Sequence, residues 1–267
     1  MIRTYVSCMA LFILITAINT STTVDALRTL DMITAHRGSS STAPENTISS
    51  VLRAIKDGAG YAEIDVQMSA DGVVVVYHDR TLKKLGNPAE ISKLTYNEII
   101  NSDAGQWFDQ VYTGERVPTL EEILGIAKNN IKLNIELKMY NSGRRLPDEV
   151  VRLIENNAFV HSCIVTSFNQ KAIERIKQKN PNIKTGLIVK SQKKINQTFL
   201  NSDINIISVK SSAVNSKLME KSAKYNKEVH VWTVNDEREM KRMLKVGVTS
   251  IITDYPEKLI KLMNLNN

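Results

Sequence analysis

The chain has 267 residues, of which 42% are hydrophobic, so it can bury one sizeable core and a single domain is expected. A formal net charge of +7 would suit a nucleic-acid-binding protein, but Lys and Arg are dispersed and form no known RNA- or DNA-binding motif. We therefore expect no nucleic-acid partner. The two cysteines, Cys8 and Cys163, exclude a disulfide framework and a cysteine-rich metal site.

The N-terminal residues have the layout of a secretory signal. Arg3 precedes an uncharged, mostly apolar run over residues 5–18, and residues 24–26 form a plausible cleavage site. The run is shorter than the ~20 residues of a membrane-spanning helix, so an uncleaved anchor is the less favoured alternative. We predict that residues 1–26 are a signal peptide or anchor. Residues 27–267 would then form a secreted or extracytoplasmic domain, compatible with membrane or cell-envelope association.

From residue 31 onward, short apolar runs alternate with amphipathic stretches, which is the pattern of a parallel α/β fold. Three helix starts carry capping-box sequences, namely Thr95 with Glu98, Thr119 with Glu122, and Asp254 with Glu257. Eight runs are interpreted as parallel strands, the number that closes a (β/α)₈ TIM barrel. These strands are expected at Ile33–Ala35, Ala62–Val66, Lys132–Glu136, Ile164–Ser167, Thr185–Ile188, Ile206–Val209, Val229–Val234 and Ser250–Thr253.

One further strand-like segment, residues 73–78, follows Asp71-Gly72. Asp-Gly between two apolar runs is typical of a two-residue hairpin turn, so this segment should return antiparallel to the strand before it. If Ala70 pairs with Val73 across the turn, Asp65 lies opposite His78. A carboxylate and an imidazole would then meet near the carboxyl end of a barrel strand.

Acidic residues gather at the predicted strand ends. Glu63 and Asp65 are two apart on one strand and project to the same face, and Glu136 ends another strand. Barrel enzymes place their chemistry at the carboxyl ends of the strands. Three carboxylates converging there would repel, and a hard divalent cation with oxygen ligands would neutralise them, whereas zinc would favour Cys or His ligands. The alternative is that these acids are solvated or form salt bridges.

Short motifs carry a resemblance to a known family. They are HRG at 36–38, APENT at 43–47, EIDV at 63–66, HD at 78–79, DAGQWF at 103–108, VPTLEE at 117–122, IELK at 135–138 and VWTVN at 231–235. In this order and spacing the chain resembles the glycerophosphodiester phosphodiesterase family over residues 34–259. The resemblance implies a hydrolase of phosphoric diesters, on a TIM barrel with a small insertion after the second strand, here about residues 66–114.

The resemblance also implies roles for individual residues. The acid–base pair would be His36 and His78, and the ligands of one divalent cation, Ca²⁺ or Mg²⁺, would be Glu63, Asp65 and Glu136. Imidazole suits proton transfer because its ordinary pKa lies at about 6.5. The other two histidines, His161 and His230, lie in no matching motif and are expected to be structural.

Five residues are further candidates for substrate binding. Arg37 follows the first strand, where its guanidinium could hold two phosphate oxygens or form an ordinary salt bridge. Lys138 could add a second positive charge or be a surface lysine. Trp232 could form an apolar wall against the glycerol or leaving group, or be a buried barrel residue. Glu45 and Asn46 begin the helix after the first strand, where Asn46 could equally cap the helix.

The expected mechanism follows from charge. A phosphodiester monoanion repels nucleophiles and its alkoxide leaves poorly, so the cation and Arg37 would stabilise the developing charge. One histidine would deprotonate the nucleophile and the other would protonate the departing alcohol. The sequence leaves open which histidine is the base. It also leaves open whether water or the neighbouring glycerol hydroxyl attacks, the latter through a cyclic phosphate.

Three functions are compatible with these residues. The leading one is hydrolysis of small deacylated lipids such as glycerophosphocholine or glycerophosphoethanolamine. A second keeps the chemistry but acts on lysophospholipids or on glycerol-phosphate polymers of a cell envelope. The third is a non-catalytic surface-binding barrel, against which the full set of expected site residues argues. A long apolar groove at the barrel mouth would favour lysophospholipids, and a small polar pocket would favour glycerophosphodiesters.

Overall fold

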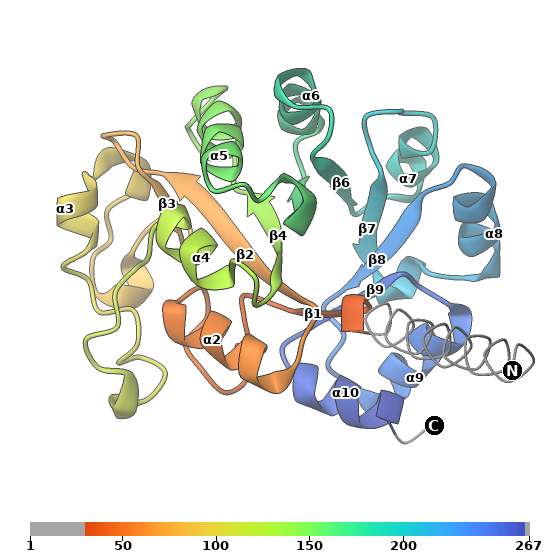
Figure 1. The fold of residues 1–267 in the computed structure, drawn as a ribbon, viewed down its shortest axis with the longest axis horizontal. Helices are drawn as coiled ribbons and strands as arrows, with labels where there is room; N and C mark the ends of the chain where they lie inside the picture. Colours follow the sequence, from red (N-terminus) through yellow and green to blue (C-terminus); the bar gives the residue numbers. More distant parts are fainter. Residues whose placement is uncertain (1–29, 265–267) are drawn as a thin grey trace, which may run out of the picture.

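The computed structural model describes residues 30–264, so the predicted signal segment and Cys8 lie outside the described residues. Within them, eight parallel strands close into a barrel surrounded by helices, as predicted (Figure 1). The order around the barrel is β1-β2-β4-β5-β6-β7-β8-β9, and β9 pairs with β1. The barrel strands are β1 Ile33–Ala35, β2 Tyr61–Met68, β4 Lys132–Leu137, β5 Cys163–Ser167, β6 Lys184–Val189, β7 Ile206–Lys210, β8 Glu228–Trp232 and β9 Ser250–Thr253.

Amphipathic helices cover the outside of the barrel and bury their apolar faces against it. Side chains such as Thr47, Asn169 and Asn215 start them by accepting hydrogen bonds from the free N–H groups of the first turn. The capping boxes predicted at Thr95 and Thr119 are both present. The helices are α2 Ile48–Asp57, α3 Tyr96–Ile99, α4 Leu120–Ala127, α5 Arg145–Asn156, α6 Gln170–Lys179, α7 Gln192–Thr198, α8 Ser216–Lys224, α9 Glu237–Val246 and α10 Pro256–Asn264.

The ninth strand, β3 (Val74–Val76), pairs antiparallel with β2, as the hairpin signal predicts. Its register is one residue away from the prediction, because the N–H of Tyr77 donates to the carbonyl of Asp65 (2.9 Å). Asp65 therefore lies opposite Tyr77, and the predicted pairing with His78 is wrong. His78 follows the end of β3, so it reaches the barrel mouth from a loop.

The register shift comes from the turn. Ser69 and Val73 close the hairpin, since the N–H of Ser69 donates to the carbonyl of Val73 (3.0 Å). Three residues, 70–72, therefore form the loop instead of two. Gly72 has φ +92°, the left-handed conformation that ends a three-residue hairpin loop and that only glycine adopts without strain.

A segment between β3 and α4 stands beside the barrel and has its own small core (Figure 1). It contains α3 and three short 3₁₀ turns, η1 Lys83–Leu85, η2 Ile91–Lys93 and η3 Gln110–Tyr112. Two further 3₁₀ turns lie outside this segment, η4 Val160–Ser162 and η5 Ser211–Ala213. Val75 of β3 joins this core, and the other buried apolar residues are Tyr77, Leu82, Ile91, Ile99, Ala104 and Val117. This segment continues the hairpin, so the loop that carries His78 packs on a fixed support.

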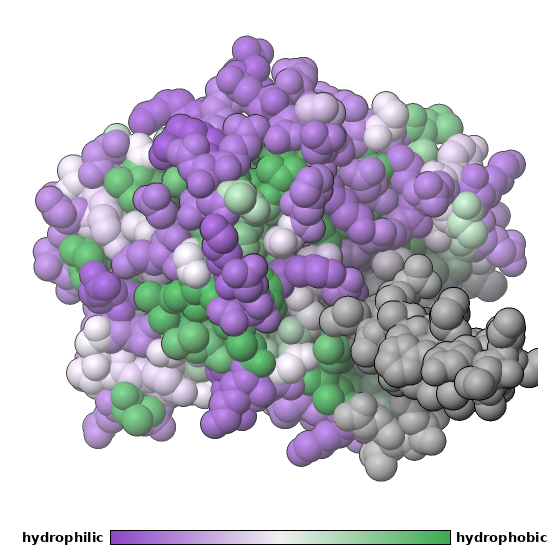
Figure 2. All heavy atoms as spheres, in the orientation of Figure 1, coloured by the Kyte–Doolittle hydropathy of each residue, from purple (hydrophilic) through white to green (hydrophobic). Residues whose placement is uncertain are grey.

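Most of the face in Figure 2 is hydrophilic, and its main apolar area lies over α2 and α4. On α2, Leu52 is 50% exposed. Among the described residues no helix has both the length and the apolar character needed to cross a bilayer.

Two glycine substitutions test the turn. Gly72→Ala should lower the free energy of unfolding by about 1 kcal/mol or more, because alanine is strained at φ +92°. Gly125→Ala makes the same chemical change inside α4, where an added Cβ meets nothing within 4 Å, and should raise it by up to about 1 kcal/mol. Urea unfolding of both variants measures whether the free energy of unfolding falls in Gly72→Ala and rises in Gly125→Ala. Equal effects would contradict the three-residue turn.

Candidate active site

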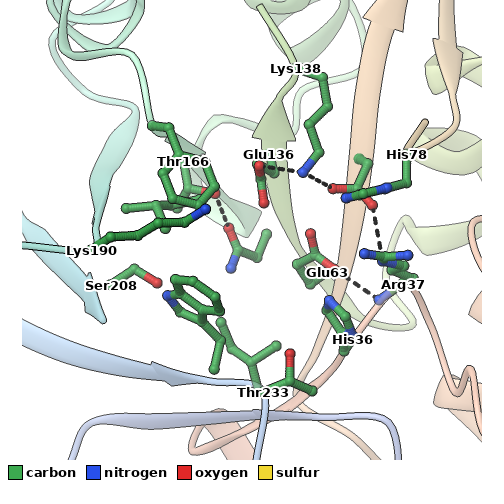
Figure 3. A pocket seen from close by; sticks show the side chains of 16 residues that line it. His36, Arg37, Glu63, His78, Glu136, Lys138, Thr166, Lys190, Ser208 and Thr233 are labelled. Carbon is green, nitrogen blue, oxygen red and sulfur yellow. Dashed lines mark hydrogen bonds and ion pairs between the residues drawn. The ribbon is translucent and has the colours of Figure 1, made fainter. Parts of the chain in front are cut away.

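The carboxyl ends of the barrel strands surround a cavity of about 220 Å³ (Figure 3). All five residues predicted for catalysis and metal binding line it, and so do three of the five predicted for substrate binding. The lining members are His36, His78, Glu63, Asp65, Glu136, Arg37, Lys138 and Trp232. Glu45 and Asn46 do not line the cavity, and instead they bind Arg37 and Asp65 respectively.

The three carboxylates meet on the neighbouring strands β2 and β4, where Asp65 lies directly opposite Glu136. Each offers an oxygen within 4.8 Å of the others. Glu63 is 4% exposed and Asp65 is 1% exposed, so the alternative of solvated strand-end acids is wrong for both. Burial and the charge of Asp65 raise the pKa of Glu63 and of Glu136. A cluster of buried oxygens with excess negative charge fits a hard divalent cation.

Lys138 partly neutralises this cluster. Its Nζ lies 2.5 Å from Oε1 of Glu136 and 3.0 Å from Oδ1 of Asp65, and its side chain is only 11% exposed. The surface-lysine alternative is therefore wrong. Burial lowers the pKa of Lys138, but the two carboxylates outweigh burial and raise it. Burial would raise the pKa of Asp65, yet Lys138 and Arg37 hold it below its usual range.

The turn after β1 aims Arg37 at the same carboxylates. Arg37 has φ +55°, and its N–H donates to Oε2 of Glu63 (2.8 Å). Its guanidinium lies 2.9 Å from Glu45 and 3.4 Å from Asp65, so it does form salt bridges while it lines the cavity. The next residue must be glycine, because a Cβ on Gly38 would lie 2.4 Å from Oγ of Ser50.

Asn46 orients Asp65 from behind. Its Nδ2 donates to Oδ2 of Asp65 (2.8 Å), and its Oδ1 accepts from the N–H of Asp65 (2.9 Å). The N-cap of α2 is Thr47, so the helix-cap alternative for Asn46 is wrong. Asn46 is buried and positions a candidate metal ligand without reaching the cavity itself.

His36 is held by a carboxylate at the predicted start of the last helix. Its Nδ1 donates to Oδ1 of Asp254 (2.6 Å), and Asp254 also accepts from Ser40 (2.9 Å) and Asn235 (2.5 Å). The predicted capping box at Asp254 is wrong, since the N–H of Asp254 donates to Asn235 and Oε2 of Glu257 has no hydrogen-bond partner in residues 30–264. The position after a barrel strand was the signal that could have identified it.

His78 is held through the backbone around it. The side-chain amide of Gln67 donates to the carbonyls of Tyr77 and Asp79, both at 2.8 Å. The hydroxyl of Tyr140 donates to the carbonyl of His78 itself (3.1 Å). Nδ1 of His78 lies 2.7 Å from Oδ1 of Asp79, a more exposed partner than the one that His36 has. Three successive carbonyls are thus fixed, which places the imidazole.

The two histidines differ in their affinity for a proton. Burial lowers the pKa of His36, but the hydrogen bond to Asp254 and nearby negative charge outweigh it, so the pKa is raised. Burial also lowers the pKa of His78, and there the cationic neighbours Lys138 and Arg37 reinforce burial, so the pKa stays below its usual value despite Asp65. One imidazole favours its protonated form and the other its neutral form.

The opposite side of the cavity is aromatic. Trp232 and Phe168 line it and pack edge to face, with ring centroids 6.0 Å apart. Trp232 is partly exposed to the cavity, as the apolar-wall interpretation requires. Phe168 and Lys190 were missed because they follow strands without a chemical motif. His161 and His230 do not line this cavity, and His230 contacts Glu228 near the start of β8.

The carboxyl end of this barrel brings acidic oxygens, two imidazoles and cationic side chains together in one cavity, a set of groups that suits phosphoric ester chemistry. The profile of the glycerophosphoryl diester phosphodiesterase family matches residues 36–258. A glycerophosphodiester phosphodiesterase of Caldanaerobacter subterraneus is 34% identical over 240 residues, which cover 87% of this chain and 97% of the relative.

Two solved structures are also similar. A phosphodiesterase of Oleispira antarctica, in complex with the product sn-glycerol-3-phosphate, has a TM-score of 0.81 and 28% identity, covering 87% of this chain and 96% of the other. A glycerophosphodiester phosphodiesterase of Agrobacterium tumefaciens has a TM-score of 0.76 and 27% identity, covering 86% and 98%. The chain belongs to the glycerophosphodiester phosphodiesterase family and is a phosphoric diester hydrolase.

Asp254→Asn tests the support of His36. Without the carboxylate the pKa of His36 should fall, which NMR titration of the imidazole measures. Because the pKa of His36 is higher in the folded protein than its value of about 6.5 in the unfolded chain, protonated His36 stabilises the fold below pH 6.5. This stabilisation is lost as the pH rises through the folded pKa. The pKa of Asp254 is lowered to about 2 in the folded protein. Ionised Asp254 therefore stabilises the fold at any pH above the ordinary pKa of an aspartate, and this stabilisation is lost as the pH falls towards 2. The variant should therefore lose most stability at pH 4–6, by about 1–2 kcal/mol.

Asp79→Asn is the matched control for that experiment. It removes the carboxylate beside the other histidine, but the side chain of Asp79 is half exposed, so stability should change by less than about 1 kcal/mol. Equal losses in the two variants, or an unchanged pKa of His36 in Asp254→Asn, would show that Asp254 does not hold the imidazolium.

Proposed function

We propose that this protein hydrolyses glycerophosphodiesters to glycerol phosphate and an alcohol, using one divalent cation and histidine acid–base catalysis. The observation that supports this most is the convergence of Glu63, Asp65 and Glu136, two of them almost fully buried, in a cavity that both His36 and His78 line. Two buried acids and a third that is partly buried hold more negative charge than Lys138 and Arg37 offset, so the arrangement favours a bound ion over a purely structural role.

The three carboxylates would hold the cation, which would supply positive charge to the phosphoryl oxygens when bound. Their oxygen-only donor set suits Ca²⁺ or Mg²⁺ and not zinc. Lys138 and Arg37 lie beside the same carboxylates, so their positive charges would also act on the phosphoryl oxygens. Arg37 can donate from a planar fork to two phosphoryl oxygens, whereas Lys138 acts as a point charge.

The different environments of the two histidines support different proposed roles for them. His36, kept protonated by Asp254, would donate its proton to the departing alkoxide oxygen. His78, kept neutral by burial and by nearby cations, would accept the proton of the attacking hydroxyl. The P–O bond to the alcohol breaks as a new P–O bond forms, and one water is consumed overall. The attacking hydroxyl belongs to water or, through a cyclic phosphate, to the glycerol.

The size of the cavity favours small diesters over lysophospholipids. A cavity of about 220 Å³, in which charged and polar side chains lie opposite the aromatic pair Phe168 and Trp232, suits a head group better than an acyl chain. We also propose that residues 27–267 form one exported barrel domain, because residues 1–26 have the layout of a signal peptide. Association with the membrane or the cell envelope is part of the same proposal.

Removal of the cation tests the role of the carboxylates. Exhaustive chelation should abolish glycerol phosphate release, and adding back Ca²⁺ or Mg²⁺ should restore it and raise the melting temperature of the protein. Glu136→Gln should show little activity and a much smaller rise in melting temperature. If chelated protein keeps its activity, and its melting temperature ignores the ion, the carboxylates are structural.

Alanine substitutions test the acid–base pair. His36→Ala and His78→Ala should each reduce kcat by about 10²- to 10⁴-fold, because each removes a proton-transfer step. His161→Ala is the matched control, since that imidazole is exposed and outside the cavity, and it should keep parental kcat. Circular dichroism should be parental in all three. Near-normal turnover in either of the first two variants would remove that histidine from the mechanism.

A further inference from the structure

Three neighbouring loops at the barrel mouth carry only positive charge. The chain after β5, β6 and β7, over residues 168–173, 190–202 and 210–219, contains six lysines and no Asp or Glu. The next acids along the chain are Glu174, Asp203 and Glu220, each directly after one of these ranges. The lysines are Lys171, Lys190, Lys193, Lys194, Lys210 and Lys217. The ends of these strands form the side of the barrel opposite β1 and β2, which carry Arg37 and the acids Glu63 and Asp65.

Two of these lysines stand at the aromatic wall. Nζ of Lys190 lies 4.8 Å from the centroid of Phe168, and Nζ of Lys210 lies 5.9 Å from that of Trp232. Both distances are within cation–π range. In residues 30–264, neither ammonium has a carboxylate partner. Lys190 lines the cavity, and Figure 3 shows it across from Arg37 and His78.

This arrangement determines which charge the wall accepts. A pair of aromatic rings would ordinarily attract a quaternary ammonium group, but Lys190 and Lys210 already place ammonium groups against Phe168 and Trp232. A second cation there would meet like charge, whereas an anion would meet two ammonium groups without carboxylate partners. The cavity thus has cationic groups on both sides and acids on one side only.

We propose that the wall formed by Phe168, Trp232, Lys190 and Lys210 receives the alcohol moiety of the diester and selects alcohols that carry a further phosphate over alcohols that carry a quaternary ammonium group. The inference rests on the proposed function. The scissile phosphate lies near Arg37 and Lys138, so the alcohol extends across the small cavity to Lys190. The alcohol of such a substrate is itself a phosphate ester, as in a deacylated diphospholipid or a glycerol-phosphate chain.

The experiment compares release of glycerol phosphate from three diesters by the metal-loaded protein. Glycerophosphocholine has a cationic alcohol, glycerophosphoglycerol a neutral one, and bis(glycerophospho)glycerol an alcohol with a second phosphate. After correction for its two equivalent diesters, bis(glycerophospho)glycerol should have a kcat/KM about tenfold above that of glycerophosphocholine at low salt, and the ratio should shrink as salt screens the lysines. An oligo(glycerol phosphate) distinguishes a polymer from a free head group as the source of the second phosphate.

Variants locate the effect. Lys190→Gln should lower that ratio by about three- to tenfold, a range suited to one exposed charge, while Lys190→Arg should preserve it. Lys245→Gln removes the same charge from the last turn of α9, where Lys245 is exposed, and should leave the ratio unchanged. Lys245→Gln should also leave kcat for glycerophosphoglycerol at the parental value, because Lys245 lies outside the cavity.

The outcomes separate this inference from the proposed function. If no diester is hydrolysed with metal present, the proposed function fails. If glycerophosphocholine is hydrolysed as well as bis(glycerophospho)glycerol or better, the function stands and the preference is overturned. The preference is also overturned if Lys245→Gln changes the ratio as much as Lys190→Gln, because net charge and not the wall would then control it. A lower ratio in Lys190→Gln alone supports the wall.

Discussion

The crowding of three carboxylates at the ends of β2 and β4 is the constraint on which the rest of the site depends. Glu63 and Asp65 are almost fully buried, and Asp65 lies opposite Glu136 across the strand pair. Left alone, these groups would repel one another in a medium that screens charge poorly. Lys138 and Arg37 offset part of the negative charge, and the remaining excess would favour binding of the proposed divalent cation.

The same constraint separates the two histidines. Each imidazole lies close to the acids, but His36 also has the carboxylate of Asp254, whereas His78 has Lys138 and Arg37 as neighbours. Proton affinity is therefore set by partners that come from different strands, and one fold can hold an acid and a base in one cavity. The supports differ as well, since Asp254 bonds the ring of His36 and Gln67 bonds the backbone around His78.

The cavity consequently has two chemically distinct sides. One side carries the carboxylates together with Arg37 and Lys138, where we propose that the cation and the reacting phosphate bind. The other side carries Phe168, Trp232 and Lys190. Glu63, Asp65 and Glu136 lie on strands and His36 lies beside the tight turn at Gly38, where backbone geometry leaves little freedom. His78 lies in a loop, and hydrogen bonds to the backbone fix that loop. The residues proposed to select the alcohol lie at strand ends and in loops, where sequence can vary without disturbing the barrel.

The sequence by itself determined the eight barrel strands, the hairpin direction and the five central site residues, because these depend on local periodicity, turn signals and motifs. The tertiary structure decided the hairpin register, which the conformation of Gly72 shifts by one residue. It also decided the partners of each site residue. Asp254 is 218 residues from His36 in the chain, yet closure of the barrel through the pairing of β9 with β1 brings their side chains to 2.6 Å. Local pattern carries no information about contacts that exist only because the barrel closes.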